Sequence, residues 1–169
     1  MPSPKLSEQL QIAGMSRAQA GAKEDAFTRI AGAWRGWSPL VPTRAWFVPG
    51  RVELLGKHTD YAGGRSLLCA LERGFCLLAA PRPDRRMRLL DIRSGQPAEF
   101  DVDQAVPLNW ARYPALVARH LAAEGRLPLG ADIAFASDLP PSAGMSSSSA
   151  FIVASYCALV GDGELGERG

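Results

Sequence analysis

The spacing of apolar residues along the chain predicts helices near its start. From residue 5 to residue 37, Ala, Ile, Leu, Phe and Trp recur every three to four positions, the interval at which side chains share one face of a helix. One or two amphipathic helices are therefore expected in this stretch. Pro39 and Pro42 follow it and are poorly suited to continuing a helix.

Other segments have the pattern of strands. Arg44–Val48 alternates bulky and polar residues, and the following Pro49-Gly50 predicts that this strand ends there. The apolar run from Ser66 to Ala80 is long enough for one or two buried strands. Further strands are expected at Met87–Ile92, Glu99–Val102 and Asp132–Ser137.

Two more helices are expected in the second half of the chain. Trp110–Ala123 has helical periodicity and is followed by Gly125, a plausible helix stop, and Ser146–Val160 forms a second helical stretch. The chain has 169 residues, of which 47% are hydrophobic and 21% are charged. This composition, together with the expected helices and strands, predicts a packed α/β or α+β domain. We expect a helical extension over residues 1–43 and a domain over residues 44–169.

The charge and the hydrophobicity of the chain argue against some classes of function. A formal charge of +2, with Lys and Arg scattered, does not suggest a nucleic-acid-binding surface. The densest basic cluster lacks interleaved aromatic residues and is interpreted as a solvated turn before a strand; it comprises Arg82, Arg85, Arg86 and Arg88. No apolar run has the length of a membrane span and the first residues lack a secretory signal, so the predicted location is the cytoplasm, with no membrane partner.

The cysteines and the tail carry weaker signals. Cys69, Cys76 and Cys157 have no C-x-x-C spacing and lie among apolar residues, so they are interpreted as buried thiols in a reducing compartment rather than zinc ligands. The last residues, GDGELGERG, are glycine-rich and charged, unlike the end of a finished domain. A truncated product, a frameshifted product, a fragment and a frayed natural terminus are all consistent with such a tail.

The loop before the last predicted helix has the composition of an anion site. Residues 138–151 read DLPPSAGMSSSSAF, which places four hydroxyls where an apolar helix begins. The unpaired N–H groups and the dipole of a first helical turn favour a phosphate, and Gly144 would allow close approach of the backbone. A serine N-cap beside a solvated loop is the structural alternative. The loop matches neither a Walker A motif nor a dinucleotide-binding fingerprint.

Residues 49–64 form a second polar segment on a backbone with four glycines. Sugar hydroxyls need paired donors and acceptors, which His58 and Asp60 can supply, and a transferring phosphoryl group needs fixed positive charge, which Arg51 can supply. His58 and Asp60 could instead be two metal ligands, although a third is not evident, and a structural set of salt bridges and caps is also possible. The other polar members are Glu53, Lys57 and Tyr61.

Together these segments resemble the GHMP small-molecule kinases, most closely the galactokinases. Residues 50–61 read GRVELLGKHTDY, similar to the family signature Gly-Arg-x-Asn-Leu-Ile-Gly-Glu-His-Thr-Asp-Tyr. Pro140–Ser149 resembles Pro-x-Gly-x-Gly-Leu-Ser-Ser-Ser-Ala, and Trp110 with Tyr113 resembles a Trp-x-x-Tyr of the middle region. The resemblance covers roughly residues 24 to 160.

The resemblance implies a fold, a reaction and a set of site residues. The implied fold is the family's amino-terminal α/β two-layer domain, an α+β arrangement with a mixed sheet packed on helices. The implied reaction is transfer of the ATP γ-phosphoryl group to a monosaccharide hydroxyl, normally the anomeric one, with ATP and Mg²⁺ as cofactors. Arg51 would stabilise the transferring group, and the substrate-binding residues would be Arg51, Lys57, His58, Asp60 and Tyr61. The nucleotide-binding residues would be Ser142, Gly144, Ser146, Ser147 and Ser148, with Ser147 as the Mg²⁺ contact.

Four positions depart from the family pattern. These positions fall at three places: Lys57, the loop residues Ser142 and Ala143, and Glu53. Lys57 stands where the family has an acidic sugar ligand, so we hypothesise that it faces an acidic substituent such as that of a uronic acid; alternatively it turns to solvent. Ser142 and Ala143 replace glycines of the phosphate loop, which narrows its backbone conformations. Glu53 replaces Asn and adds a negative charge near Arg51, which would orient or partly neutralise it.

The family's catalytic aspartate, an acidic Mg²⁺ ligand and a carboxy-terminal domain would lie after residue 169. The 169-residue polypeptide alone is therefore expected to phosphorylate nothing. Two alternatives to a kinase part stay open at this point. One is a non-catalytic sugar and nucleotide sensor of galactokinase descent, and the other is a truncated remnant without function.

Overall fold

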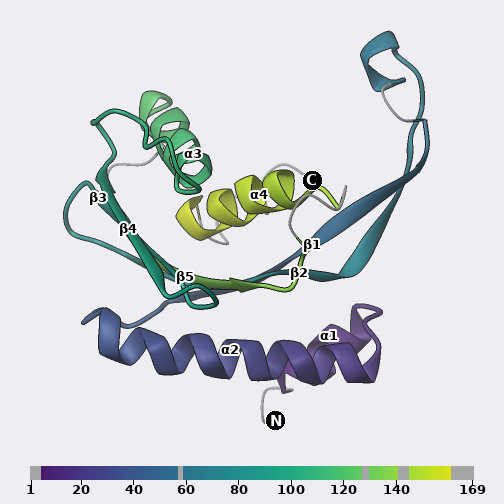
Figure 1. Ribbon diagram of the computed structural model, residues 1–169, viewed down its shortest axis with the longest axis horizontal. Helices are drawn as coiled ribbons and strands as arrows, with labels where there is room; N and C mark the ends of the chain where they lie inside the picture. Colours follow the sequence, from purple (N-terminus) through teal and green to yellow (C-terminus); the bar gives the residue numbers. More distant parts are fainter. Residues whose placement is uncertain (1–4, 57–58, 127–129, 141–144, 161–169) are drawn as a thin grey trace.

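The computed structural model describes residues 5–56, 59–126, 130–140 and 145–160, with Asp60 described by its backbone. Helices and strands alternate along the chain as the apolar pattern predicts (Figure 1). In chain order they are α1 (Leu6–Ile12), α2 (Arg17–Trp37), β1 (Arg44–Leu55), the 3-10 turn η1 (Asp60–Ala62), β2 (Leu67–Pro81), β3 (Arg86–Asp91), β4 (Gln96–Asp101), α3 (Arg112–Ala123), β5 (Ala131–Ser137) and α4 (Ser147–Val160).

The five strands form one mixed sheet in the order β1-β2-β5-β3-β4. β5 inserts between β2 and β3, pairing antiparallel with β2 and parallel with β3, while the β1–β2 and β3–β4 pairs are antiparallel hairpins. The expected mixed sheet packed on helices is confirmed. The last strand in sequence is thus the central one, and it leads directly into the loop before α4.

Helices cover both faces of the sheet, so the molecule has three layers where two were expected (Figure 1). On one face α2 buries Ile30 and Trp34 against Cys76, Ala80 and Ala134 of the sheet. On the other face α3 and α4 pack over the alternate residues of the same strands, including Leu77, Ile133 and Phe135. Successive side chains of a strand point to opposite faces, and here both sets are apolar and need cover. The division of the chain at residue 43/44 stays a prediction.

Strand β1 continues to Leu55, so the expectation that Pro49-Gly50 ends it is wrong. β1 lies at the edge of the sheet, where a proline without an N–H is tolerated. The pairing with β2 shifts between Pro49 and Arg51, so the strand passes this point through an irregularity instead of stopping.

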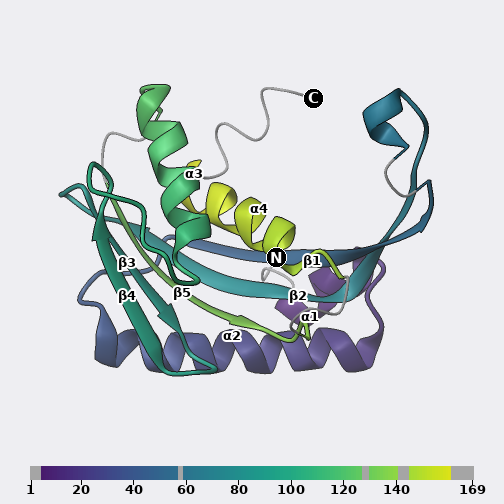
Figure 2. The ribbon, with the colours of Figure 1, turned by 45° about the horizontal axis from the view of Figure 1, so that its top comes forward.

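Strand β2 is a single strand, and only part of it is buried. Leu67 is 54% exposed, whereas Phe75 and the alternate residues after it lie in the core, so the expectation of burial holds for the second half only. Cys69 falls in the exposed half and is itself exposed, which corrects its assignment as a buried thiol; Cys76 and Cys157 are buried. The exposed half pairs with the outer end of β1 in a long hairpin (Figure 2).

Gly74 pairs with Pro49 where the register of the hairpin shifts, and replacing it with alanine should destabilise the fold. An added Cβ would lie 2.2 Å from the carbonyl oxygen of Val48, a backbone atom that cannot turn aside. We expect Gly74→Ala to lower the free energy of unfolding by about 2 kcal/mol or more. Urea denaturation measures the change. The control is Gly36→Ala, at an exposed position of α2 with nothing within 4 Å of the new Cβ, and it should raise the free energy of unfolding by about 0.5–1 kcal/mol. Equal changes in the two variants would contradict the close approach of Gly74 to Val48.

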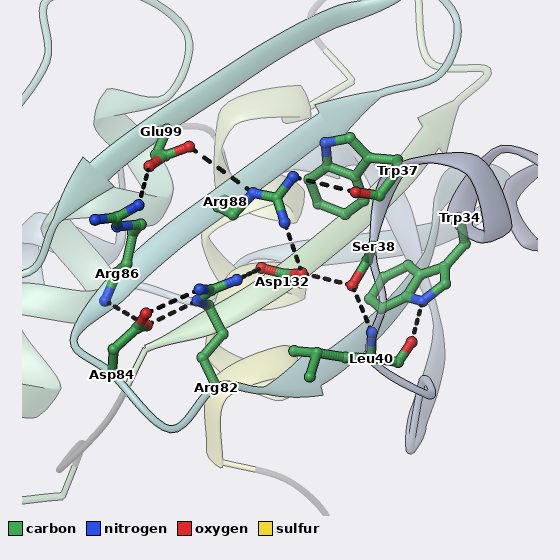
Figure 3. Close-up of polar contacts among 10 residues, drawn as sticks. All are labelled: Trp34, Trp37, Ser38, Leu40, Arg82, Asp84, Arg86, Arg88, Glu99 and Asp132. Carbon is green, nitrogen blue, oxygen red and sulfur yellow. Dashed lines mark hydrogen bonds and ion pairs between the residues drawn. The ribbon is translucent and has the colours of Figure 1, made fainter.

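A buried carboxylate organises the basic cluster near the β2–β3 turn (Figure 3). Asp132 of β5 is fully buried and accepts hydrogen bonds from Arg82 at 2.8 Å, from Arg88 at 3.3 Å and from the Ser38 hydroxyl at 2.6 Å. Arg88 also donates to the carbonyl oxygen of Trp37 and lies over its ring. The interpretation of this cluster as a solvated turn is therefore wrong for Arg82 and Arg88, because the fold places an acidic residue of a distant strand beneath them.

Among the described residues, the structure has no helix that combines the length and apolarity needed to cross a lipid bilayer.

Candidate functional site

The first turn of α4 meets β1 at Arg51. The Arg51 Nε donates a hydrogen bond to the Ser146 hydroxyl at 3.2 Å, and the Arg51 backbone N–H donates to the Met145 carbonyl oxygen at 3.3 Å. Of the sequence-predicted site residues, Arg51 and Ser146 are thus in direct contact. The two polar segments, 95 positions apart in the sequence, meet at this point.

Gly50 makes this contact possible because β1 passes very close to the loop before α4. A Cβ on Gly50 would lie 2.5 Å from the Leu139 side chain and 2.9 Å from the Met145 carbonyl oxygen. A larger residue would push the strand away and take Arg51 with it. In this motif, Gly50 therefore allows the close backbone approach that places the Arg51 guanidinium beside Ser146.

The start of α4 offers hydrogen-bond donors at this place. Ser147 opens the helix, and Ser146 before it has a positive φ of 53°, which turns the chain sharply into the first turn. The first N–H groups of a helix have no acceptor within the helix, and they carry a partial positive charge. Ser146 and Ser147 are half-buried and Ser148 is exposed. Ser142 and Gly144 lie outside the described residues.

A pocket of about 330 Å³ lies on one side of this helix start, and we call it the Arg51 pocket. Its polar lining comes from Arg51, Ser146 and Ser149, and the rest is apolar. The apolar lining consists of Val48, Pro49, Gly50, Leu68, Ala70, Ala150 and Val153.

A second pocket of about 320 Å³, the aromatic pocket, shares the same helix turn through Ser147. Its walls include an aromatic cluster in which Phe151 lies 4.8 Å from Phe135 and 4.9 Å from Phe75, measured between ring centroids. Trp110 meets Phe135 edge to face at 5.5 Å. The polar lining consists of Asp91, Arg93, Ser137 and Ser147. Sequence reasoning missed this pocket; the only signal for it was the Trp-x-x-Tyr at Trp110 and Tyr113.

Of the remaining predicted sugar-binding residues, the structure describes the side chain of Tyr61 alone, and Tyr61 belongs to η1, at the tip of the β1–β2 hairpin that projects away from α4 (Figures 1 and 2). Tyr61, on η1, is 83% exposed there. Lys57 and His58 lie outside the described residues, as does the side chain of Asp60. The structure therefore does not bring Tyr61 to Arg51.

Local hydrogen bonds hold the two arms of the hairpin together below its tip. The Thr59 hydroxyl donates to the Gly56 carbonyl oxygen at 2.7 Å, and the Ser66 hydroxyl donates to the same oxygen at 3.0 Å. Gly56 has a φ of +84°, and a Cβ there would lie 2.2 Å from the Arg65 carbonyl oxygen. Glu53, further down β1, is exposed, and no ion pair joins it to Arg51 in the described part of the chain.

Comparison with known proteins identifies both segments. The family model "Galactokinase galactose-binding signature" matches residues 39–81, and "GHMP kinases N terminal domain" matches residues 112–161. The mixed sheet, with α4 behind a serine-rich loop, defines the amino-terminal domain type of the small-molecule kinases. The chain belongs to the GHMP kinase family, and within it to the galactokinase branch.

The curated relatives are galactokinases. The chain is 42% identical over 117 residues to the galactokinase of Chloroflexus aggregans and 40% identical over 121 residues to that of a Roseiflexus species, matches that cover 67% and 70% of this chain. In both cases the match covers 30% of the relative, so this chain spans less than a third of the curated relatives' length.

Solved structures share the fold. Lactococcus lactis galactokinase, solved with galactose, superposes with a TM-score of 0.59 and 28% identity, covering 66% of this chain and 30% of that one. Methanococcus jannaschii mevalonate kinase gives a TM-score of 0.58 at 16% identity, covering 72% and 40%, and at that identity it supports the fold alone.

Proposed function

We propose that this chain is the nucleotide-binding part of a galactokinase-like sugar kinase, which transfers the γ-phosphoryl group of ATP to a monosaccharide hydroxyl. The observation that carries the proposal is the contact of Arg51 with Ser146 at the start of α4, between the Arg51 pocket and the aromatic pocket. A guanidinium beside a helix N-terminus suits a polyphosphate, because both supply positive charge and N–H donors.

In the proposed complex the purine ring enters the aromatic pocket and packs against Trp110. Ser147 lines that pocket and Ser146 lines the Arg51 pocket, so a nucleotide bound in the first reaches the second across the first turn of α4. The terminal phosphate then lies beside Arg51. Its fixed charge stabilises the negative charge of the transferring group, which is the main task of a protein in phosphoryl transfer.

Mg²⁺ fits this arrangement as an ion held chiefly by the nucleotide. The described residues contain no cluster of three His, Cys, Asp or Glu side chains that could hold a metal. Mg²⁺ typically keeps several waters and binds through phosphates with one or two protein ligands, and hydroxyl oxygen is an acceptable ligand. Ser147 is the proposed protein contact, with Ser148 as its neighbour. When bound, the ion would neutralise phosphate charge.

The proposed acceptor is galactose or a related sugar or uronic acid, phosphorylated at C1. The sugar would be held by His58 and Asp60, with Tyr61 and Lys57 in the same segment. Since η1, which carries Tyr61, stands away from α4, Tyr61 reaches the Arg51 pocket only if the hairpin bends (Figure 1). We propose a cytoplasmic location, because both substrates are found there.

Calorimetric titration of the 169-residue chain with ATP–Mg²⁺ and with adenosine tests the nucleotide site. We expect Arg51→Met to weaken ATP binding about tenfold, through loss of a charge-assisted contact, and to leave adenosine binding unchanged. The control is Arg17→Met, at an exposed position of α2, and it should change neither the ATP affinity nor the adenosine affinity. In the longer protein that carries this chain, Arg51→Met should lower kcat/KM for galactose about 100-fold. Equal weakening of ATP and adenosine, or no ATP binding, would refute the proposal.

A further inference from the structure

A cavity of about 410 Å³ lies between α2 and the face of the sheet that α2 covers. We call it the α2 cavity, because α2 forms one wall, while the middle of β2, the residues after β3 and the end of β5 form the other. Much of its apolar lining consists of alanine side chains from both walls, and we call these the alanine floor. The lining residues with charged, hydroxyl or thiol side chains are Lys23, Arg29, Cys76, Arg93, Ser137 and Asp138.

Lys23 is the feature that sets this cavity apart, because its side chain is only 3% exposed. Its ammonium group forms an ion pair with Asp138, whose other carboxylate oxygen accepts the Gly74 N–H at 2.8 Å. One bond to Asp138 uses one of the three N–H donors of the lysine, whose Nζ also lies 5.5 Å from the centroid of the Phe47 ring. Burying an ammonium group costs free energy unless its donors are satisfied, so the cavity side of Lys23 is suited to a second acceptor.

Two further cations stand at the cavity with free guanidinium groups. The side chains of Arg29 and Arg93 are exposed, and within the described residues neither makes a hydrogen bond or ion pair. Three cations therefore face one carboxylate, an excess of two positive charges. Burial raises the pKa of the Cys76 thiol to about 12, so the thiol is neutral at physiological pH and adds no negative charge.

We propose that the α2 cavity binds a small dianion with a compact apolar body, such as an aromatic or short aliphatic phosphomonoester or dicarboxylate. The dianionic head pairs with Arg29, Arg93 and the free donors of Lys23, and the apolar body rests on the alanine floor. Two charges match the local excess, and a volume of about 410 Å³ is in the range of small-ligand pockets. The α2 cavity adjoins the aromatic pocket, with which it shares Arg93 and Ser137, whereas Lys23 and Arg29 line the α2 cavity and not the aromatic pocket.

Calorimetry on the 169-residue chain tests the proposal with phenyl phosphate and phthalate as the two dianions and benzyl alcohol as the neutral probe. We expect both dianions to bind and benzyl alcohol not to bind. Arg29→Met should weaken dianion binding about tenfold, because Arg29 lines this cavity and neither of the other two pockets described above. Binding of one dianion alone identifies the head group, phosphate or carboxylate.

Two controls locate the site. Arg35→Met, also exposed on α2, and Arg51→Met, at the start of α4, should leave dianion affinity unchanged. Amide chemical shifts should move at Ala26 and Ala136, which line the cavity, and not at Ser148. An unchanged affinity in a folded Arg29→Met variant, shifts confined to the start of α4, or affinities weaker than about 10 mM for both dianions would overturn the proposal.

Discussion

Replacing Asp132 with asparagine is expected to lower the free energy of unfolding by about 3 kcal/mol, because it removes the fully buried carboxylate shared by Arg82 and Arg88, which keep only the more exposed carboxylates of Asp84 and Glu99. Asp132 is fully buried and binds two arginines and the Ser38 hydroxyl (Figure 3). An asparagine offers one acceptor oxygen and directs N–H groups at the remaining donors. Urea denaturation followed by tryptophan fluorescence measures the loss.

The matched control for this substitution is Asp103→Asn. Asp103 also pairs with an arginine, Arg85, at 2.6 Å, but its side chain is 63% exposed. Exposed ion pairs contribute little, so the control should change stability by less than about 1 kcal/mol. A loss at Asp132 no larger than that at Asp103 would show that the buried network does not hold α2 to the sheet.

Phe151→Ala should have an effect of similar size through packing rather than charge. Phe151 of α4 is stacked on Phe75 with a centroid distance of 4.9 Å and an interplanar angle of 11°, and it also contacts Phe135 and Trp110. Truncating a core phenylalanine removes buried area and leaves a cavity, which costs about 3–5 kcal/mol. Urea denaturation is again the measurement.

Ile152→Ala is the control for the aromatic cluster. Ile152 follows Phe151 on the same helix, but it is 41% exposed and points away from the sheet's core. Its truncation should cost about 1 kcal/mol or less, since the site is open to solvent and alanine favours the helix. Equal losses at the two positions would mean that α4 is held by helix propensity rather than by its aromatic contacts.

Much of the local structure follows from the sequence. Helical periodicity located α2, α3 and α4 to within a few residues, and alternation, an apolar run and turn residues located the strands that the structure describes. The prediction failed at Pro49-Gly50 and in the first half of β2. In both places a local rule, that proline ends strands or that apolar runs are buried, was overridden by position in the sheet, because an edge strand tolerates proline and a projecting hairpin has nothing to cover it.

For the candidate site too, the sequence predicted some features and missed others. The residue types of the two polar segments predicted phosphate and sugar chemistry, and the contact of Arg51 with Ser146 is compatible with that prediction. The aromatic pocket and the α2 cavity had no comparable signal, since their walls come from four or more separate elements with ordinary apolar residues between them. Sequence reasoning also placed Arg82 and Arg88 in solvent, because their buried partner is 50 and 44 positions away.

By itself, the sequence determined where helices and strands form and which residues are candidates for phosphate and sugar chemistry, because those properties depend on spacing and side-chain type within a few positions. Only the tertiary structure decided that β5 lies in the middle of the sheet, that α2 closes its second face, and that Arg51 meets the start of α4. Each of these is a pairing between distant segments, selected by the burial of apolar faces and the satisfaction of buried polar groups, which act on the whole chain at once.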